Sequence, residues 1–230
     1  MTPEAIDWLT PAGAKPIILA SASRARRAML ARSGVAFDVA TAPIDESAIK
    51  DALRDEAGCL TVAAADVAEV LAQAKAMSVS EQNTSAMVIG SDQVLELDGE
   101  LLSKPEGRAG ARRQLRQLSG RAHRLHSAAA LAIGGAVVWS HVDTTDLTMR
   151  ALSDEFIDAY LDHAGEDILY CVGAYQIESV GVQLFEAIEG DYFTILGMPL
   201  LPLLAELRRR GQLFGGGLDN GRFDSGHHPA

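Results

Sequence analysis

A short apolar segment, followed by a hydroxyl-rich turn and a basic helix, constrains the fold of this chain most strongly. Ile17–Ala20 is apolar throughout, as a buried strand is, and the run after Ser23 has helical composition. A strand that turns directly into a helix points the N–H groups of the first helical turn, and the positive end of the helix dipole, at one place. Arg24, Arg26 and Arg27 surround that place. The segment predicts an α/β protein with a phosphate site at this turn.

A plainer interpretation of the turn is that Ser23 only caps the helix and that the arginines are solvated. The charge of the whole chain favours the anion site. The 230 residues have a formal net charge of -11, so the basic turn is a local positive region in a negative molecule. The same net charge argues against broad binding to nucleic acid or to an anionic membrane surface.

The cysteines and the N-terminal residues predict a soluble, cytoplasmic protein. Cys59 and Cys171 are far apart and lack metal-type spacing, so they indicate neither a disulfide framework nor a zinc site. Glu4, Asp7 and Pro11 stand where a signal peptide has a basic start and an unbroken apolar run. No stretch approaches the roughly 20 apolar residues that cross a bilayer.

Apolar periodicity and turn residues predict alternating strands and helices along the chain. The expected strands cover residues 17–20, 35–40, 86–92, 122–133, 136–150 and 182–188. The expected helices run from 24 to Gly34, 61–79 with Thr61 as cap, 107–118, 153–163 with Ser153 as cap, and 199–210. A hairpin turn is expected at Asp98-Gly99, a second at Gly134-Gly135, and a mobile tail without core residues after Gly211.

Several charged residues are candidates for chemistry. Asp92 is expected where an apolar strand ends, a common place for a catalytic or metal-binding carboxylate, although an Asx-turn is the alternative. Glu46 follows an expected strand in a loop, where it lines a site edge or belongs to a solvated turn. The hairpin brings Lys104 towards the same cleft as Asp92. Lys75 lies near the apolar side of its helix, where lysines usually extend to water.

Two further groups of side chains have no expected catalytic role. The arginines of the 107–118 helix are expected to form a solvated face. His123 and His126 are three positions apart on one strand, so they point to opposite faces and are not a metal pair.

Taken together, these motifs resemble the Maf family of nucleoside triphosphate pyrophosphatases. The matching blocks, in order, are Leu19-Ala20-Ser21-Ala22-Ser23 with Arg26-Arg27, Ile44-Asp45-Glu46, residues 71–76, residues 89–94, Ser103-Lys104-Pro105, residues 118–120, Gly173-Ala174-Tyr175, and residues 188–192 with 197–200. The resemblance covers residues 16–211. It implies one catalytic domain there, with an N-terminal extension over 1–15 and a tail over 212–230.

The resemblance implies hydrolysis of a nucleoside triphosphate to the monophosphate and pyrophosphate, assisted by Mg²⁺ or Mn²⁺. It also implies an elongated, two-lobed mixed sheet with flanking helices, a site in the cleft between the lobes, and often a homodimer. Residue by residue, the phosphate turn corresponds to Ser21, Ser23, Arg26 and Arg27. The acidic residues correspond to Glu46 and Asp92, which are metal ligands with Asp92 also a candidate base, and the lysines correspond to Lys75 and Lys104.

In the family that this chain resembles, three positions determine which nucleobase is preferred, and they correspond to Ala25, Gln93 and Glu178. Gln93 and Glu178 are similar to the branch that hydrolyses 7-methyl-GTP. A carboxylate suits that base, because N7-methylation makes the purine cationic and a carboxylate accepts N–H donors. Ala25 departs from this branch, which has a large aromatic residue there, and Arg24 replaces a family proline. The general activity, removal of modified or non-standard nucleotides, is therefore the primary expectation.

A function of another class is also consistent with the sequence. The family is linked to septum formation, which implies a non-catalytic nucleotide-binding regulator of cell division as the alternative. A nucleic-acid binder that uses the arginines near 24–27 and 112–116 is opposed by the acidic net charge. Turnover of nucleotides distinguishes the enzyme from both.

Overall fold

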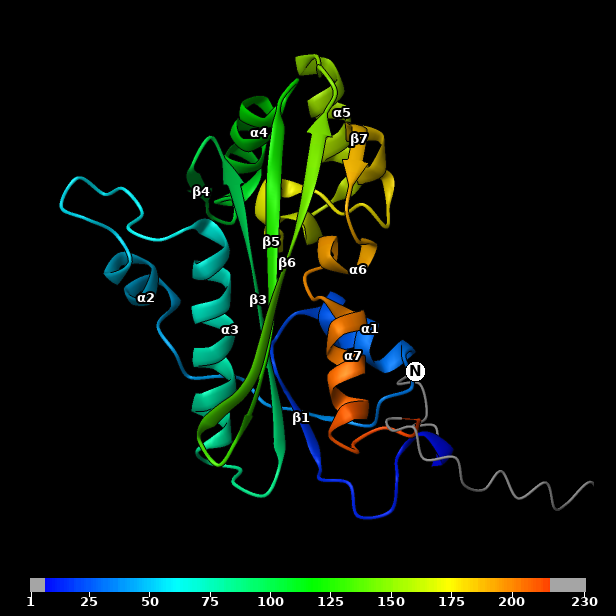
Figure 1. Ribbon diagram of the computed structural model, residues 1–230. Helices are drawn as coiled ribbons and strands as arrows, with labels where there is room; N and C mark the ends of the chain where they lie inside the picture. The colour runs from blue at the N-terminus through cyan, green and yellow to red at the C-terminus, as the bar shows by residue number, and fades with distance from the viewer. Residues whose placement is uncertain (1–6, 216–230) are drawn as a thin grey trace, which may run out of the picture.

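A seven-stranded mixed sheet runs through the molecule, with helices packed on both sides (Figure 1). The structure is a computed structural model that describes residues 7–215. The strand order is β2-β1-β3-β5-β6-β7, and β4 pairs with β3 outside this path. β1 is parallel to β2 and β3, whereas the other neighbouring strands are antiparallel. The α/β class with a mixed sheet and flanking helices is confirmed.

Strands and helices are interspersed along the described part of the chain, with the following bounds. The strands are β1 (Ile17–Ala20), β2 (Asp38–Val39), β3 (Met87–Leu97), β4 (Glu100–Leu102), β5 (Ala122–Ile133), β6 (Ala136–Met149) and β7 (Phe185–Glu189). The α-helices are α1 (Arg24–Arg32), α2 (Glu46–Ala52), α3 (Ala64–Ser80), α4 (Gly107–Leu118), α5 (Asp154–Ala164), α6 (Tyr192–Ile195) and α7 (Leu200–Arg209). Short 3₁₀ helices are η1 (Asp7–Leu9), η2 (Asp167–Tyr170), η3 (Val172–Ala174) and η4 (Val180–Leu184).

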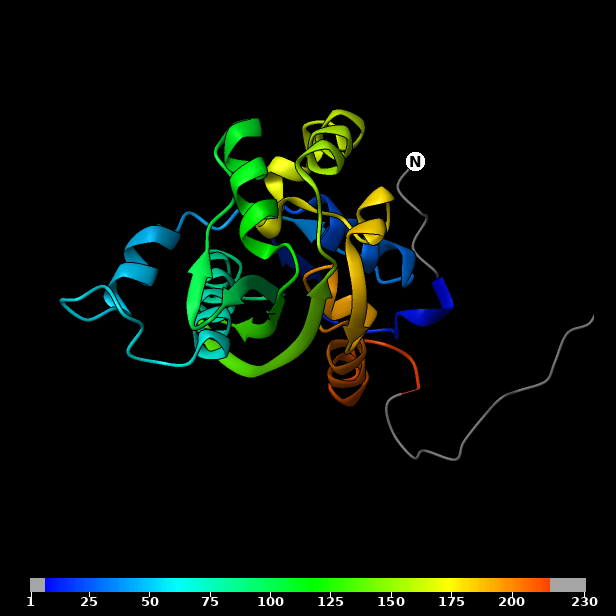
Figure 2. The same ribbon diagram turned by 90° about the horizontal axis from the view of Figure 1, so that it is seen from above.

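Three long strands connect the two ends of the molecule. β3, β5 and β6 have 11, 12 and 14 residues, and they pair along most of their length. At one end, α4 and α5 pack on an apolar cluster that includes Leu115 and Leu161. At the other end, α1 and α7 cover one side of the sheet and α3 covers the opposite side, as both views show (Figures 1 and 2). The two ends therefore share one sheet.

Helix α3 lies unusually close to the sheet because small side chains meet there. Ala72 and Ala76 of α3 and Ala130 of β5 are fully buried in one cluster. At Gly90 of β3, an added Cβ would lie 2.1 Å from the carbonyl oxygen of Ala72 and 2.7 Å from the backbone nitrogen of Ala76. This approach places the α3 side chain Lys75 over the same strand.

Most expected elements are confirmed, including the hairpin at Asp98-Gly99, the two long strands, and the helix from Ser153 to Gly165. Asp92, however, does not end a strand. β1 pairs with β3 only as far as Gly90, but β5 pairs with β3 as far as Glu96, so the ladder continues and β3 runs to Leu97. Both the strand-end and the Asx-turn interpretations are therefore wrong: Asp92 lies within the strand.

Two other strands are shorter than expected. Only Asp38–Val39 pairs with β1, and Val35 is buried in the apolar cluster that contains Met29 and Leu30 of α1. β7 begins at Phe185, because Val180–Leu184 forms a 3₁₀ helix.

The start of α3 and the surface of α4 also differ from expectation. Thr61 does not cap α3, since its hydroxyl donates to the carbonyl of Leu53; Ala63 is the N-cap, and Asp66 accepts from its backbone N–H. The arginines of α4 are not simply solvated. Arg112 donates to Asp158 of α5 at 2.7 Å, and Arg116 pairs with Asp154, so these ion pairs join α4 to α5.

The chain ends also make core contacts that the sequence did not predict. Leu213 is buried in the cluster around α7, and the side chain of Gln212 accepts from the backbone N–H of Lys15 at 2.8 Å. Residues 212–215 therefore pack on the domain, whereas we expected a tail there. The rest of that expected tail, residues 216–230, lies outside the described part of the chain. Within residues 7–215, no helix is both long and apolar enough to cross a membrane.

His123 lies in a buried aromatic cluster at the α4–α5 end of the sheet. Its Nε2 is 2.9 Å from the hydroxyl of Tyr175, and its ring contacts Phe185. His126 instead contacts Glu96 and Thr144, so the two histidines face opposite ways, as expected. Burial lowers the pKa of His123 from 6.5 to about 4.

We expect His123 to make the fold acid-sensitive. The unfolded chain binds a proton at this histidine below pH 6.5, but the folded chain does so only near pH 4, so stability falls as pH falls between these values. The full loss is about 3 kcal/mol, at about 1.4 kcal/mol per pH unit. Urea unfolding at pH 7.5 and pH 5 covers the part of this window above pH 5 and should show a loss of about 2 kcal/mol. His123→Gln should lose less stability over this range than the parent, and His141→Gln is the control. Equal losses in parent and His123→Gln would contradict this.

Candidate functional site

The candidate site lies where β1 ends and β3 continues, still paired with β5 but no longer with β1. β1 pairs with β3 up to Ala20, and the chain then turns through Ser21 and Ser23 into α1. The hydroxyl of Ser21 accepts from the N–H of Ser23 at 3.2 Å, and the hydroxyl of Ser23 accepts from the N–H of Arg26 at 3.3 Å. The serines thus shape the turn, and Ser23 is the helix cap.

Arg26 links this turn to β3 and to the turn before α7. Its Nη1 donates to the carbonyl of Ser91 at 2.9 Å, just beyond the last residue that β1 pairs with. Its Nε donates to the carbonyl of Gly197 at 2.7 Å. Burial lowers the pKa of Arg26, and the charges of Asp92 and Glu46 oppose that fall. Arg26 is therefore a buried cation beside two carboxylates, with much of its hydrogen-bonding capacity used by the fold.

The central feature is a lysine between two carboxylates. The Nζ of Lys75 lies 2.5 Å from Oδ1 of Asp92 and 2.8 Å from Oε1 of Glu46. Lys75 and Asp92 are buried, at 8% and 5% relative exposure, whereas the Glu46 side chain is 44% exposed. Burial raises the pKa of Glu46, but the hydrogen bond and charge of Lys75 outweigh it, so this pKa lies below its usual value. The Lys75 side chain therefore does not extend to water, although lysines near the apolar side of a helix usually do.

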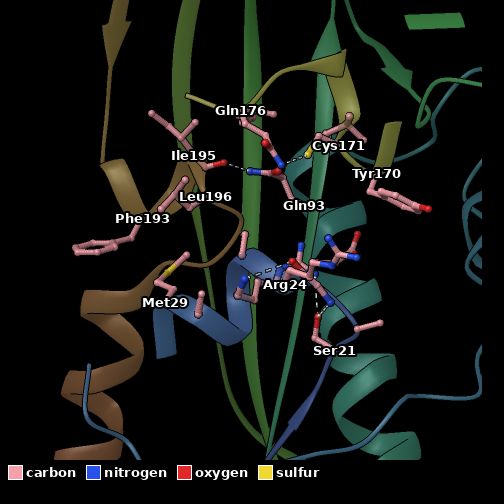
Figure 3. Close-up of a pocket in the computed structure, with 18 of the residues that line it drawn as sticks. Ser21, Arg24, Met29, Gln93, Tyr170, Cys171, Gln176, Phe193, Ile195 and Leu196 are labelled. Atoms are coloured by element: carbon pink, nitrogen blue, oxygen red, sulfur yellow. Dashed lines mark hydrogen bonds between the residues drawn. The ribbon is translucent and has the colours of Figure 1, made fainter. Parts of the chain in front are cut away.

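The turn and the acid–lysine cluster open into one cavity of about 1410 Å³. Its wall includes the turn and α1 on one side, and the segment from Asp167 to Glu178 and residues 192–196 on the other (Figure 3). Basic side chains outnumber acidic ones in the wall. The basic residues are Arg24, Arg26, Arg32, Lys50, Lys75 and Lys104, and the acidic residues are Glu46, Asp92, Asp167 and Glu178. An acidic chain thus has a cavity that favours a small anion.

The structure gathers all but one of the expected site residues. Those that line the cavity are Ser21, Ser23, Ala25, Arg26, Glu46, Lys75, Asp92, Gln93, Lys104 and Glu178. Arg27 is exposed on α1 and is not part of the wall. Lys104 lies beyond the end of β4 rather than on it, and it is exposed at the cavity.

The wall also contains residues that the sequence did not mark as part of a site, namely Asp167, Tyr170, Cys171 and Phe193. Arg24 pairs with Asp167 at 3.1 Å, which joins α1 to the segment around η2. Tyr170, Cys171 and Phe193 also line the cavity (Figure 3). Asp167 and Tyr170 come from the 3₁₀ helix η2, Cys171 follows it, and Phe193 comes from the short helix α6. Tertiary packing brings these segments to the site, so local patterns could not identify them.

The fold and the cavity define an α/β protein with a basic cavity, suited to a small anion, at the end of a parallel strand pair. The chain belongs to the Maf family, because the family model described as "Maf-like protein" matches residues 16–210.

Curated relatives match nearly their whole length. A protein of Nitrobacter hamburgensis named nucleoside triphosphate pyrophosphatase is 48% identical over 206 residues, 90% of this chain and 98% of that protein. Proteins of Brucella abortus and Mesorhizobium japonicum are both named 7-methyl-GTP pyrophosphatase. They are 50% and 51% identical over 193 and 199 residues, which cover 84% and 86% of this chain and 95% and 98% of theirs.

Proposed function

We propose that this protein hydrolyses a nucleoside triphosphate to the nucleoside monophosphate and pyrophosphate in the cytoplasm. The observation that carries the proposal is the buried Lys75 ammonium between Glu46 and Asp92, in a cavity with a net basic wall. A basic wall attracts a polyphosphate, and a carboxylate next to it, such as the buried Asp92, can accept a proton. The names of the relatives support the same reaction.

In the proposed reaction, a water oxygen bonds to the α-phosphorus as the bond from that phosphorus to the bridging oxygen of pyrophosphate breaks. Asp92 orients the water and accepts its proton. Lys75 and Lys104 stabilise the negative charge that develops on the phosphoryl oxygens and on the leaving pyrophosphate. The turn at Ser21 and Ser23 binds phosphate oxygens. Arg26 holds this turn in place through its hydrogen bonds to the carbonyls of Ser91 and Gly197. Arg27 lies outside the cavity wall and would reach phosphate only by moving.

The donor set also fits a divalent cation. Within residues 7–215, no three His, Cys, Asp or Glu side chains converge on one point. Glu46 and Asp92 nevertheless meet at Lys75, and carboxylate oxygens are ligands that Mg²⁺ and Mn²⁺ prefer. These cations commonly keep waters and phosphate oxygens as their remaining ligands, so two protein carboxylates suffice. Bound there, such a cation would neutralise phosphate charge.

A 7-methyl-GTP substrate is the more specific candidate, because two relatives have that name and Glu178 lines the cavity. The carboxylate can attract the cationic methylated purine. Ala25 lacks a ring that could stack on it, so this candidate needs a comparison of turnover on 7-methyl-GTP, GTP, dTTP and UTP.

Hydrolysis in water enriched in oxygen-18 tests the reaction itself. We expect Mg²⁺- or Mn²⁺-dependent release of pyrophosphate, with the label in the monophosphate because attack occurs at the α-phosphorus. Label in pyrophosphate or in inorganic phosphate would contradict the proposed bond cleavage. Nucleotide binding without turnover across canonical, methylated and deaminated bases would contradict enzymatic function and favour a regulatory role.

A further inference from the structure

Three arginines stand in the first turn of α1, and they differ in whether they can contact a ligand. Arg26 is buried, and its guanidinium donates to two backbone carbonyls of the fold. Arg27 is exposed outside the cavity wall. Arg24 lies in the cavity wall at the turn (Figure 3), and among the described residues only Asp167 pairs with its side chain. Arg24 is therefore the arginine of this turn that can reach an anion in the cavity.

The ion pair that holds Arg24 is exposed and weak. Nη1 of Arg24 lies 3.1 Å from Oδ1 of Asp167, and the two side chains are 83% and 62% exposed. Exposed ion pairs contribute little to stability, because water competes with both partners. Asp167 would remain hydrated if the guanidinium moved away. Arg24 can therefore exchange one anionic partner for another at little cost.

The position of Arg24 at the start of α1 favours an additional anion. Arg24 is the first residue of the helix, directly after the cap Ser23, and the first turn contains no acidic residue. Cations at this place oppose the positive end of the helix dipole, whereas an anion stabilises it. Asp167 supplies one negative charge from another segment. A polyphosphate carries several charges and can bind a guanidinium through two oxygens, so it is the stronger partner.

We infer that Arg24 leaves Asp167 and binds the polyphosphate when the substrate enters, so that Asp167 competes with the substrate for one guanidinium. This inference rests on the proposed function, because the polyphosphate belongs to the same substrate. Asp167 takes Arg24 back as pyrophosphate leaves, which favours product release. The exchange also loosens η2 from α1, because this is the one ion pair that joins them in the described part of the chain.

Four proteins test the exchange: the parent, Arg24→Gln, Asp167→Asn and the double variant. Calorimetry measures the Kd of pyrophosphate with Mg²⁺ present, and steady-state kinetics measure KM for the nucleotide. Arg24→Gln should raise both constants by about fivefold or more, because the polyphosphate loses a charged hydrogen-bond donor. Asp167→Asn should lower both by about twofold to fivefold, which is the range that an exposed ion pair is worth. Both side chains are exposed, so both variants should fold.

The double variant distinguishes the exchange from a general effect of charge in the wall. If Asp167 acts through Arg24, Asp167→Asn should have no effect in the Arg24→Gln background, whereas a general effect would be equal in both backgrounds. Arg108→Gln is the matched control. Arg108 forms an exposed ion pair with Asp162 at 2.9 Å away from the cavity, so its loss should change neither constant.

Two results would overturn the inference and leave the proposed function standing. One is an equal effect of Asp167→Asn in the two backgrounds. The other is weaker binding in both single variants, which is what a purely structural ion pair would give. Absence of turnover on every nucleotide would instead overturn the proposed function, and the Kd values for pyrophosphate would still decide whether Arg24 exchanges its partner.

Discussion

Asp92→Asn should reduce turnover by at least about a thousandfold while the protein stays folded. Asparagine keeps the shape of the side chain but cannot accept the proton from the attacking water, and general base catalysis is typically worth 10²–10⁴-fold. The amide also loses the charge that pairs with Lys75 at 2.5 Å. Lys75 keeps Glu46 as a partner at 2.8 Å, so it is not left as an isolated buried charge. Pyrophosphate release measures the activity, and thermal unfolding measures the fold.

Asp143→Asn is the control for this variant. Asp143 lies on β6, pairs with His141 at 3.0 Å and is absent from the cavity wall, so its loss should change turnover by less than about twofold. If folded Asp92→Asn kept more than a tenth of the parent rate, Asp92 would not be the base. The proposed roles of the cluster would then need to be reassigned.

Gly90→Ala should destabilise the protein strongly, because the space between α3 and β3 cannot hold a methyl group. The added Cβ would lie 2.1 Å from the Ala72 carbonyl oxygen and 2.9 Å from the Ala76 Cβ, and the first of these is backbone that cannot rotate away. Helix α3 must therefore move from the sheet, which we expect to cost about 3 kcal/mol or more. Because Lys75 is on α3 and Asp92 is on β3, their contact should also loosen and turnover should fall. Urea unfolding and pyrophosphate release measure the two effects.

Gly134→Ala separates this clash from ordinary backbone strain. Gly134 has a φ of 58° and nothing within 4 Å of an added Cβ, so its substitution should cost only about 1 kcal/mol. Turnover should not change, because Gly134 is in a hairpin turn away from the cavity. Equal destabilisation by both substitutions would show that the close packing of α3 is not what makes Gly90 necessary.

Much of this fold could be predicted because its signals are local. Ser153 and Gly165 bound α5, and Asp98-Gly99 forms a tight hairpin, since caps and turns depend on residues a few positions apart. The length of β3 could not be predicted in this way. It continues past Gly90 because β5 provides partners, and those partners are distant in the sequence, as Ala130 is from Gly90.

The site shows the same difference between local signals and contacts between residues that are distant in the sequence. Asp92 and Lys75 are candidates on sequence grounds, but the usual position of a helical lysine suggests contact with water. The short distance between α3 and β3 keeps Lys75 between the carboxylates instead. Tyr170 and Phe193 gave no signal at all, because nothing in the surrounding residues marks either ring as part of a cavity wall.

Both ends of the molecule share β3, β5 and β6, and these shared strands limit how the two ends can move. A clamshell motion, in which the walls around the nucleotide swing apart on a hinge, would have to bend or break this continuous ladder. We therefore expect ligand entry to involve shifts of the irregular segments, such as residues 167–178, against a rigid frame. Selection of the nucleotide then depends on how well it fits a largely preformed shape.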